Sequence, residues 1–239
     1  MADDKAVEVP VAVKTSDLPK RVASAVVMLA VAGAAFWIGG AVLAGFIWLV
    51  ALVGFGECVL LVPKATSNLA WRIVGIVAAA AYFGLAAWVM ASLDTYYLVA
   101  AIGVVIFTDT GAYFTGRAIG GPKIAPKISP SKTWAGLFGG MAFAALWLAI
   151  VAGMFFYTAG YRTWSELIDI AWDDVTGAAL VGALLAVVAQ AGDFFQSWLK
   201  RKAGVKDSSR LIPGHGGVFD RIDGMLAVAL VVGVLEGFA

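Results

Sequence analysis

The stretch SWLKRKAGVKDSSRLIPGHGGVFDRID, residues 197–223, is the longest strongly polar run in a very apolar chain. It holds six of the 17 Lys and Arg residues, three carboxylates, the single histidine His215 and the pair Gly216-Gly217. Apolar segments of membrane length lie on both sides of it. Lys and Arg also collect in ordinary cytoplasmic loops, but that leaves the carboxylates, the histidine and the glycines unexplained. We therefore interpret this stretch as a candidate reaction site at a membrane surface.

The composition around this stretch predicts an integral membrane protein. Of the 239 residues, 62% are hydrophobic and 14% are charged, and the mean hydropathy is +0.90. Soluble domains are typically about 45–50% apolar and about 25% charged. The net charge of +1 gives no overall field that would attract nucleic acid. The expected fold is all-α: a polytopic transmembrane helix bundle of residues 22–239 after a polar tail of residues 1–21.

Seven apolar segments are expected to cross the bilayer, whose hydrocarbon core of about 30 Å needs about 20 helical residues. They are residues 22–38, 41–62, 70–91, 96–116, 135–157, 176–198 and 224–239. The first segment is short for a complete crossing. An acidic connection, residues 158–175, is expected between the fifth and sixth spans, with Trp164 and Trp172 as interfacial anchors. The polar start of the chain is followed by two apolar segments in succession, which is not typical of a signal peptide.

The distribution of basic residues predicts the orientation. With a cytoplasmic N-terminus and seven crossings, all but one of the 17 Lys and Arg residues fall on the cytoplasmic side, and Arg162 is the exception. This positive-inside bias favours a cytoplasmic N-terminus and an external C-terminus. It also puts the two richest polar loops, residues 117–134 and 199–223, on one cytoplasmic face.

Three carboxylates lie inside apolar segments, where a charge is costly and needs a partner, a metal or a water-filled cavity. Asp193 is the strongest functional candidate, because Asp193, Ser197 and Lys200 are spaced i, i+4, i+7 and share one helical face. Asp109 precedes Gly116 on the fourth span, where a small residue allows close helix packing. For Glu57, late in the second span, we favour a carboxylate at the membrane interface over a polar contact inside the bundle.

The loop RAIGGPKIAPKISPSKTW, residues 117–134, has the glycines and prolines of a shaped loop rather than a helix. Its lysines and hydroxyl side chains are donors suited to phosphate oxygens. The run Ser131-Lys132-Thr133 precedes the fifth span, so its amides are expected at a helix N-terminus, which is a ready anion site. Nonspecific binding of anionic headgroups would use the same composition.

The carboxylates around the polar stretch suit a hard cation. Asp220 and Asp223 are three residues apart, and Asp193 meets them if the sixth and seventh spans pack together. Carboxylates without Cys or His partners favour Mg²⁺, and a single histidine argues against zinc. His215 is therefore expected to hydrogen-bond within a glycine-rich turn. Carboxylates for Mg²⁺, many cations and glycine turns together indicate phosphoryl or nucleotidyl transfer.

The run S-x-L-K-R-x4-K-D-x-S-x2-I-P-x-H-G-G-V-x-D-R-I-D at residues 197–223 resembles the signature of the phosphatidate cytidylyltransferases (CDP-diacylglycerol synthases) at every defined position. The segments DTGAYFTGRAIG at 109–120 and KISPSKTWAG at 127–136 are similar to this family in the same order. The resemblance covers about the last 130 residues, and residues 1–95 match as hydrophobic spans. One departure is Ala135, where members usually carry a glutamate.

This resemblance implies that CTP and phosphatidic acid react to CDP-diacylglycerol and pyrophosphate with one Mg²⁺ ion or two. It also implies an inner (cytoplasmic) bacterial membrane, a cytoplasmic active site, membrane lipids as partners, no nucleic acid, and a homodimer as one allowed assembly. The metal ligands it implies are Asp193, Asp220 and Asp223. The catalytic or positioning residues it implies are Asp193, Ser197, Lys200, His215 and Asp220. The substrate-binding residues it implies are Ser129, Ser131, Lys132, Thr133, Arg201, Lys206 and Arg221.

Two alternative functions stay open from the sequence. A CTP-dependent kinase of a lipid alcohol would use similar groups, although the long signature favours the diacylglycerol product. An ion or solute transporter would use Asp109 and Asp193 as pathway carboxylates. Transporters often show internal repeats with broken helices, whereas here the polar residues gather on one face.

Overall fold

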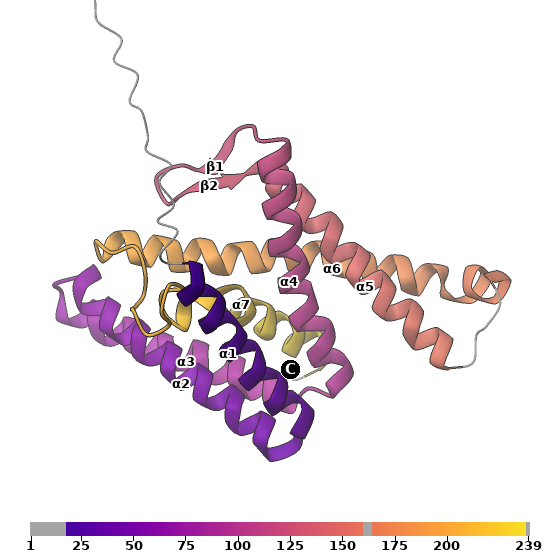
Figure 1. The fold of residues 1–239 in the computed structure, drawn as a ribbon, viewed down its shortest axis with the longest axis horizontal. Coiled ribbons are helices and arrows are strands. Elements are labelled where there is room, and N and C mark those ends of the chain that lie inside the picture. Colours follow the sequence, from indigo (N-terminus) through magenta and orange to yellow (C-terminus); the bar gives the residue numbers. More distant parts are fainter. Residues whose placement is uncertain (1–17, 160–163, 238–239) are drawn as a thin grey trace, which may run out of the picture.

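The computed structural model describes the backbone of residues 18–159 and 164–237, and the side chains of these residues except 164–172. Seven helices and one β-hairpin make up the described part (Figure 1). In chain order they are α1 (Leu18–Ile38), α2 (Gly40–Ala65), α3 (Leu69–Ser92), α4 (Thr95–Ala118), β1 (Lys123–Ala125), β2 (Ser129–Thr133), α5 (Trp134–Thr158), α6 (Trp164–Lys202) and α7 (Phe219–Leu235).

The predicted helix bundle is confirmed. The first six expected spans each lie in a separate helix, and α1 to α6 are long and apolar enough to cross a membrane. The seventh, expected over residues 224–239, overlaps α7, which ends at Leu235. Helix α7, at 17 residues, is not among these six. Residues 18–21, counted with the polar tail, belong to α1, and residues 1–17 lie outside the described part of the chain.

One expected connection is wrong. Residues 158–175 were expected to link two spans, but α6 already begins at Trp164 and runs for 39 residues. The acidic side chains there do not stop the helix, because Asp and Glu are tolerated where a helix leaves the apolar layer. The side chains of Trp164 and Trp172 lie outside the described residues, so their role as interfacial anchors stays a prediction.

Helix α7 forms the centre of the packing, against α2, α3, α4 and α6. It belongs to two buried clusters. Phe219, Leu226 and Ala229 pack with residues of α2 and α3, whereas Val228 and Val232 pack with residues of α4, α5 and α6. The helix that follows the polar stretch therefore joins the two halves of the bundle. Figure 1 shows it lying between α2 and α3 on one side and α4 on the other.

Close packing of α4 on α5 depends on glycines that face the neighbouring helix. A Cβ on Gly116 would lie 3.5 Å from Gly136 Cα, and one on Gly111 would lie 2.6 Å from the Gly139 carbonyl oxygen. The expectation that Gly116 allows close helix packing is confirmed. This contact holds the hairpin, which connects α4 to α5, at one end of the bundle.

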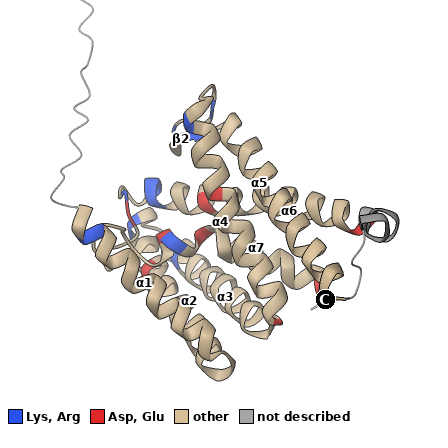
Figure 2. Ribbon diagram, turned by 45° about the vertical axis from the view of Figure 1, so that its right-hand side comes forward, with Lys and Arg blue, Asp and Glu red and all other residues tan. Residues whose placement is uncertain are grey.

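The loop expected at residues 117–134 is an antiparallel hairpin of β1 and β2. Residues 119–133 are not helical, as predicted, but the two short strands were not foreseen, and Arg117, Ala118 and Trp134 belong to the flanking helices. Figure 2 shows Lys and Arg gathered near this hairpin, the start of α1 and the end of α6, with acidic residues deeper in α4 and α7. The same end of the bundle thus carries the polar loops and the candidate site.

Candidate active site

The polar stretch 197–223 forms the end of α6, a loop and the first turn of α7. In the loop, Gly214 and Gly216 have φ angles of 77° and 83°, which residues with a Cβ rarely adopt. The backbone N–H of Ile212 donates to the Gly216 carbonyl at 2.8 Å and closes the turn. This turn brings the chain back, so that α7 starts beside the end of α6.

Asp220, in the first turn of α7, has every side of its carboxylate occupied. Its Oδ1 accepts from Gln196 Nε2 at 2.8 Å and from Lys200 Nζ at 2.6 Å. Its Oδ2 accepts from the backbone N–H groups of Ser208 at 2.8 Å and Gly217 at 2.9 Å. Burial acts to raise the pKa of Asp220, but the hydrogen bonds from Lys200, Gly217 and Ser208 outweigh it and lower the pKa below its ordinary value. Asp220 is therefore ionised and firmly oriented.

Glu57 of α2 holds the same loop from the other side. The interpretation as an interfacial carboxylate is wrong, because Glu57 is only 5% exposed. Its Oε1 accepts from Ser209 Oγ at 2.6 Å and from Val218 N at 3.0 Å. Its Oε2 accepts from Phe219 N at 2.8 Å and lies 2.8 Å from Ser208 Oγ. A polar contact inside the bundle, the alternative considered for Glu57, is what the structure contains.

Asp193 of α6 pairs with Lys132 of β2. The two side chains form an ion pair, and Lys132 Nζ also donates to Gln190 Oε1 at 2.8 Å and lies 4.9 Å from the centre of the Phe194 ring. Ser197 Oγ donates to Asp193 Oδ1 at 3.2 Å. The expected i, i+4 contact is thus present, and the hairpin is tied to α6 by a lysine that the sequence analysis placed in substrate binding.

Two more carboxylates lie near this pair. Asp109 of α4 and Asp223 of α7 interact electrostatically with Asp193 and Lys132. Burial, followed by the negative charge of Asp193, raises the pKa of Asp223 to about 7. Lys132 forms its ion pair with Asp193, and the positive charges of Lys132 and Arg221 both act on Asp109. Carboxylates gathered in this way are oxygen donors that suit a divalent cation.

A ready metal centre is not formed in this arrangement. Within residues 18–159 and 173–237, no three acidic, His or Cys side chains come together closely enough to hold an ion. Asp193 and Asp220 each face a lysine instead. The donor set nevertheless fits Mg²⁺, because it consists of carboxylate oxygens. A bound ion would take the place of a lysine ammonium group.

The hairpin residues predicted to bind phosphate have different surroundings. Thr133 is the N-cap of α5, and its hydroxyl accepts from Gly136 N at 3.0 Å. The expected anion site at this helix start is thus capped by the chain itself. Ser129 is buried, whereas Ser131 is exposed. Lys132 is the hairpin side chain that reaches the carboxylates.

The remaining predicted residues lie around the edge of the site. His215 Nδ1 lies 2.9 Å from Ser24 Oγ of α1, so its described contact is with that helix and not with a carboxylate. Arg221 donates to the His215 carbonyl at 2.8 Å, and Arg201 donates to a hairpin carbonyl at 3.3 Å. Lys206 is exposed in the loop. All three cations are exposed.

Nothing in the sequence indicated a site role for Gln196 or Ser208, and Glu57 was placed at the membrane interface rather than at the site. An acid within an apolar span was a usable signal for Glu57, because such residues are rarely without a polar partner. No local spacing could name that partner, which is about 150 residues away in the chain. Gln196 lies one residue before the signature, and no motif or spacing in the sequence indicated a role for it.

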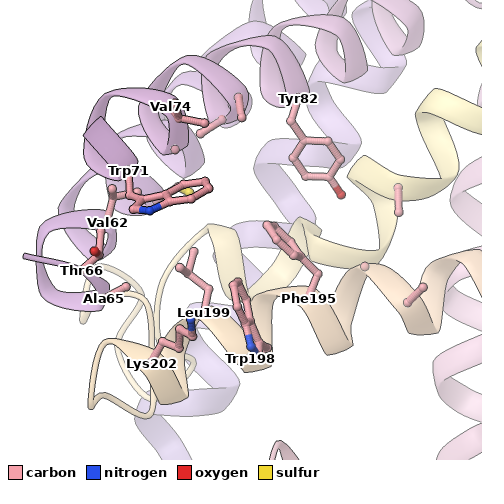
Figure 3. Close-up of a pocket in the computed structure, with 17 residues that line it drawn as sticks. Val62, Ala65, Thr66, Trp71, Val74, Tyr82, Phe195, Trp198, Leu199 and Lys202 are labelled. Carbon is pink, nitrogen blue, oxygen red and sulfur yellow. The ribbon is translucent and has the colours of Figure 1, made fainter. Parts of the chain in front are cut away.

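A cavity of about 850 Å³ lies between α3 and α6, with residues of α2 and α7 completing its walls (Figure 3). Its walls are apolar except near one end, where Lys202 Nζ lies 4.8 Å from the centre of the Trp198 ring. Lys202 lies on the side of α6 opposite Asp193, as expected for residues nine apart in a helix. Tyr82, which also lines the cavity, interacts electrostatically with Asp223. The cavity therefore approaches the carboxylates from the α3 side.

Comparison with known proteins identifies a family. Residues 74–238 match the model of the cytidylyltransferase family. This match contains the hairpin, the carboxylates of α4, α6 and α7, and the whole polar stretch, whereas Glu57 lies before it.

Several curated relatives are named phosphatidate cytidylyltransferase. The chain is 39% identical to the one from Brucella suis over 189 residues, which are 75% of this chain and 63% of the relative. It is 36% identical to the one from Pseudomonas aeruginosa over 202 residues, covering 81% of this chain and 69% of the relative. It is 32% identical to the one from Rickettsia felis over 190 residues, covering 78% and 79%. The chain thus spans less than two thirds of the length of the Brucella relative.

Proposed function

This chain belongs to the cytidylyltransferase family, and we propose that it transfers the cytidylyl group of CTP to phosphatidic acid, giving CDP-diacylglycerol and pyrophosphate for phospholipid synthesis. The observation that carries this proposal is the pair of lysine–carboxylate contacts at one polar end of an apolar bundle. Lys132 faces Asp193, and Lys200 faces Asp220. Such a site can exchange its lysines between carboxylates and phosphates when a charged substrate enters.

Mg²⁺ is the cofactor that we propose, held by Asp193, Asp220 and Asp223 with Asp109 beside them. When bound, Mg²⁺ neutralises charge on the phosphates of CTP. Both lysines would then be released toward phosphate oxygens. Lys132 and Lys200 are therefore assigned a double role, as partners of the carboxylates in the free protein and as phosphate ligands in the complex.

The reaction forms a bond between a phosphate oxygen of phosphatidic acid and the α-phosphorus of CTP, and breaks the bond from that phosphorus to the β-phosphate bridging oxygen. No general base is required, because the second pKa of a phosphomonoester is about 6 and the attacking oxygen is already ionised. The task of the protein is to hold two anions in line. Arg201, Lys206 and Arg221 supply further positive charge at the edge of the site, and Ser197 orients Asp193.

The lipid substrate is proposed to keep its acyl chains in the cavity between α3 and α6. The apolar walls suit acyl chains, and Gly192 of the inner wall packs against Asp223, because a Cβ there would lie 2.5 Å from the Asp223 carbonyl oxygen. The volume of about 850 Å³ lies within the range of about 300–1,000 Å³ that is usual for ligand pockets. The phosphate of the same lipid would then reach the carboxylates from the α3 side.

The remaining proposals concern location and assembly. We place the protein in the inner membrane of a bacterium with the site on the cytoplasmic side, supported by the positive-inside bias. A homodimer is the assembly that we propose, on the family resemblance alone. Labelling of single cysteines placed in the loops of a Cys58→Ser chain tests the orientation, and light scattering of the purified protein tests the assembly.

The test of the reaction uses the purified full chain in detergent with labelled CTP, phosphatidic acid and Mg²⁺. We expect equal amounts of CDP-diacylglycerol and pyrophosphate. Asp193→Asn should remove this activity, whereas Asp94→Asn should keep it, because Asp94 precedes α4 and its side chain makes no capping hydrogen bond. A lipid-alcohol kinase would release CDP without pyrophosphate, and a transporter would form no product. Either result with folded protein would contradict the proposal.

A further inference from the structure

Glu57 lies outside the residues that match the family, yet it is the most completely bonded carboxylate near the site after Asp220. It sits on α2, about 150 residues before the loop that it holds. Its two oxygens contact two hydroxyl groups and two backbone N–H groups at 2.6 to 3.0 Å. A buried carboxylate with four such contacts is costly to remove and therefore fixes its surroundings.

The connection from Glu57 to the reaction site passes through Ser208. Ser208 Oγ lies 2.8 Å from Glu57 Oε2 and 2.8 Å from Asp220 Oδ2. The Ser208 hydroxyl thus lies within hydrogen-bond distance of both carboxylates, and the Ser208 backbone N–H donates to the same Asp220 oxygen. Oδ2 of Asp220 is thereby held toward the loop, which leaves Oδ1 facing Gln196 and Lys200 of α6.

We propose that Glu57 is a positioning residue: through Ser208 it orients Asp220, so that Asp220 Oδ1 is presented toward α6 for metal and substrate. This inference rests on the proposed function for the role of Asp220. Gly217 packs directly against this contact: a methyl group at Gly217 would collide with both Ser208 Oγ and the Glu57 carboxylate. The space between these groups admits no side chain.

A second consequence concerns the start of α7. Val218 N and Phe219 N, the first two backbone N–H groups at this helix N-terminus, both donate to Glu57. A helix N-terminus attracts anions, but here a protein carboxylate already fills that place. The substrate phosphates are thereby directed to Lys132, Lys200 and Arg221 rather than to the α7 backbone.

The test compares Glu57→Gln and Ser208→Ala with a control of matched burial, Leu61→Ala, one turn further along α2 and fully buried. Glutamine keeps the size of Glu57 but turns an NH₂ group toward backbone donors. For both test variants we expect the Mg²⁺ concentration for half-maximal activity to rise roughly tenfold, as for other groups behind a metal ligand. Leu61→Ala should lower the unfolding temperature without moving this value. An unchanged Mg²⁺ requirement in folded Glu57→Gln and Ser208→Ala would overturn the proposal.

Hydrogen–deuterium exchange of the full chain gives a readout that does not depend on activity. Glu57→Gln should raise exchange in the peptide covering residues 208–218, and Leu61→Ala should raise it less, because Leu61 shares a buried cluster with Phe219, outside that peptide. If wild type makes no CDP-diacylglycerol, the proposed function fails, but the exchange result still decides whether Glu57 holds the loop. Equal exchange in wild type and Glu57→Gln, or a rise of the same size in Leu61→Ala, would refute the positioning role.

Discussion

Lys200 Nζ and Asp220 Oδ1 lie 2.6 Å apart, and this buried ion pair joins the last turn of α6 to the first turn of α7. Both side chains are largely shielded, with 12% and 6% of their surface exposed. Water therefore screens the pair little, and each charge depends on the other. This ion pair and the Gln196–Asp220 hydrogen bond join the polar ends of the two helices that carry most of the candidate site.

Replacing Lys200 should lower the stability of the folded protein. Lys200→Met leaves Asp220 buried without its cation, which typically costs about 3–5 kcal/mol. For a chain of this size we expect a fall in the unfolding temperature of about 10 °C, measured by thermal denaturation in detergent. The double variant Lys200→Met/Asp220→Asn should recover part of this loss but no activity. Equal stability of wild type and Lys200→Met would contradict the importance of the pair.

The pH dependence of stability follows from the lowered pKa of Asp220. A carboxylate with a lower pKa in the folded state contributes stability above its unfolded pKa of about 3.9, and this contribution is lost as the pH falls through the folded value. The difference in unfolding temperature between wild type and Asp220→Asn should thus be constant above about pH 5 and shrink below about pH 4. Asp223 titrates in both proteins and cancels in the difference. A difference that grows on acidification would show the opposite sign and refute this assignment.

Lys132 is expected to be needed for activity more than for folding. It faces Asp193, with Asp109 and Asp223 nearby, and its side chain is 15% exposed at the edge of the bundle. Loss of one positioned donor to a reacting phosphate typically lowers kcat by about 10²–10³. Lys132→Gln should show a loss of that order in a CDP-diacylglycerol assay. Lys123→Gln, in the other strand of the same hairpin, should keep the wild-type rate.

Gly217 should tolerate no side chain. Gly217→Ala would push a methyl group against Ser208 Oγ and the Glu57 carboxylate, and so separate the loop from α2. We expect both the unfolding temperature and kcat to fall. Gly153→Ala is the matched control, since a Cβ there meets nothing within 4 Å and alanine favours a helix. A Gly217→Ala protein with wild-type stability would show that the loop has room to move.

The bundle could be predicted from the sequence because a membrane-spanning helix satisfies its own backbone hydrogen bonds. A long apolar segment is therefore enough to identify each span. The same is true of Asp193, Ser197 and Lys200, whose shared face follows from helical spacing. The first residues of α6, from Trp164, were predicted to belong to the acidic connection, because this polar start of the helix has no hydropathy signal. Hydropathy therefore identifies the apolar part of each helix, but it does not identify helical residues that lie outside the apolar layer.

The tertiary contacts of the site could not be predicted. Glu57 and Ser208 are about 150 residues apart, and no spacing rule connects them. His215 was expected among catalytic groups, but its ring contacts Ser24 of α1, a helix with no motif. Thr133 was expected to help bind an anion, but it caps α5. Polar residues in a signature thus divide into those that face substrate and those that hold the fold, and only packing separates the two groups.

The cavity between α3 and α6 provides the last prediction, which concerns the length of the acyl chains. Ala78 lines this cavity, so Ala78→Trp should fill part of it. The KM for dioleoyl phosphatidic acid should rise about tenfold, the usual order for a misfit in an apolar pocket. The KM for the short dihexanoyl lipid and for CTP should stay near the wild-type values, because neither needs the depth of the cavity. Ala80→Trp, on an exposed position of α3 outside the cavity, is the control. If both lipids were affected equally, or if Ala80→Trp had the same effect, the acyl chains would have to lie elsewhere, and the cavity would have no part in binding the lipid substrate.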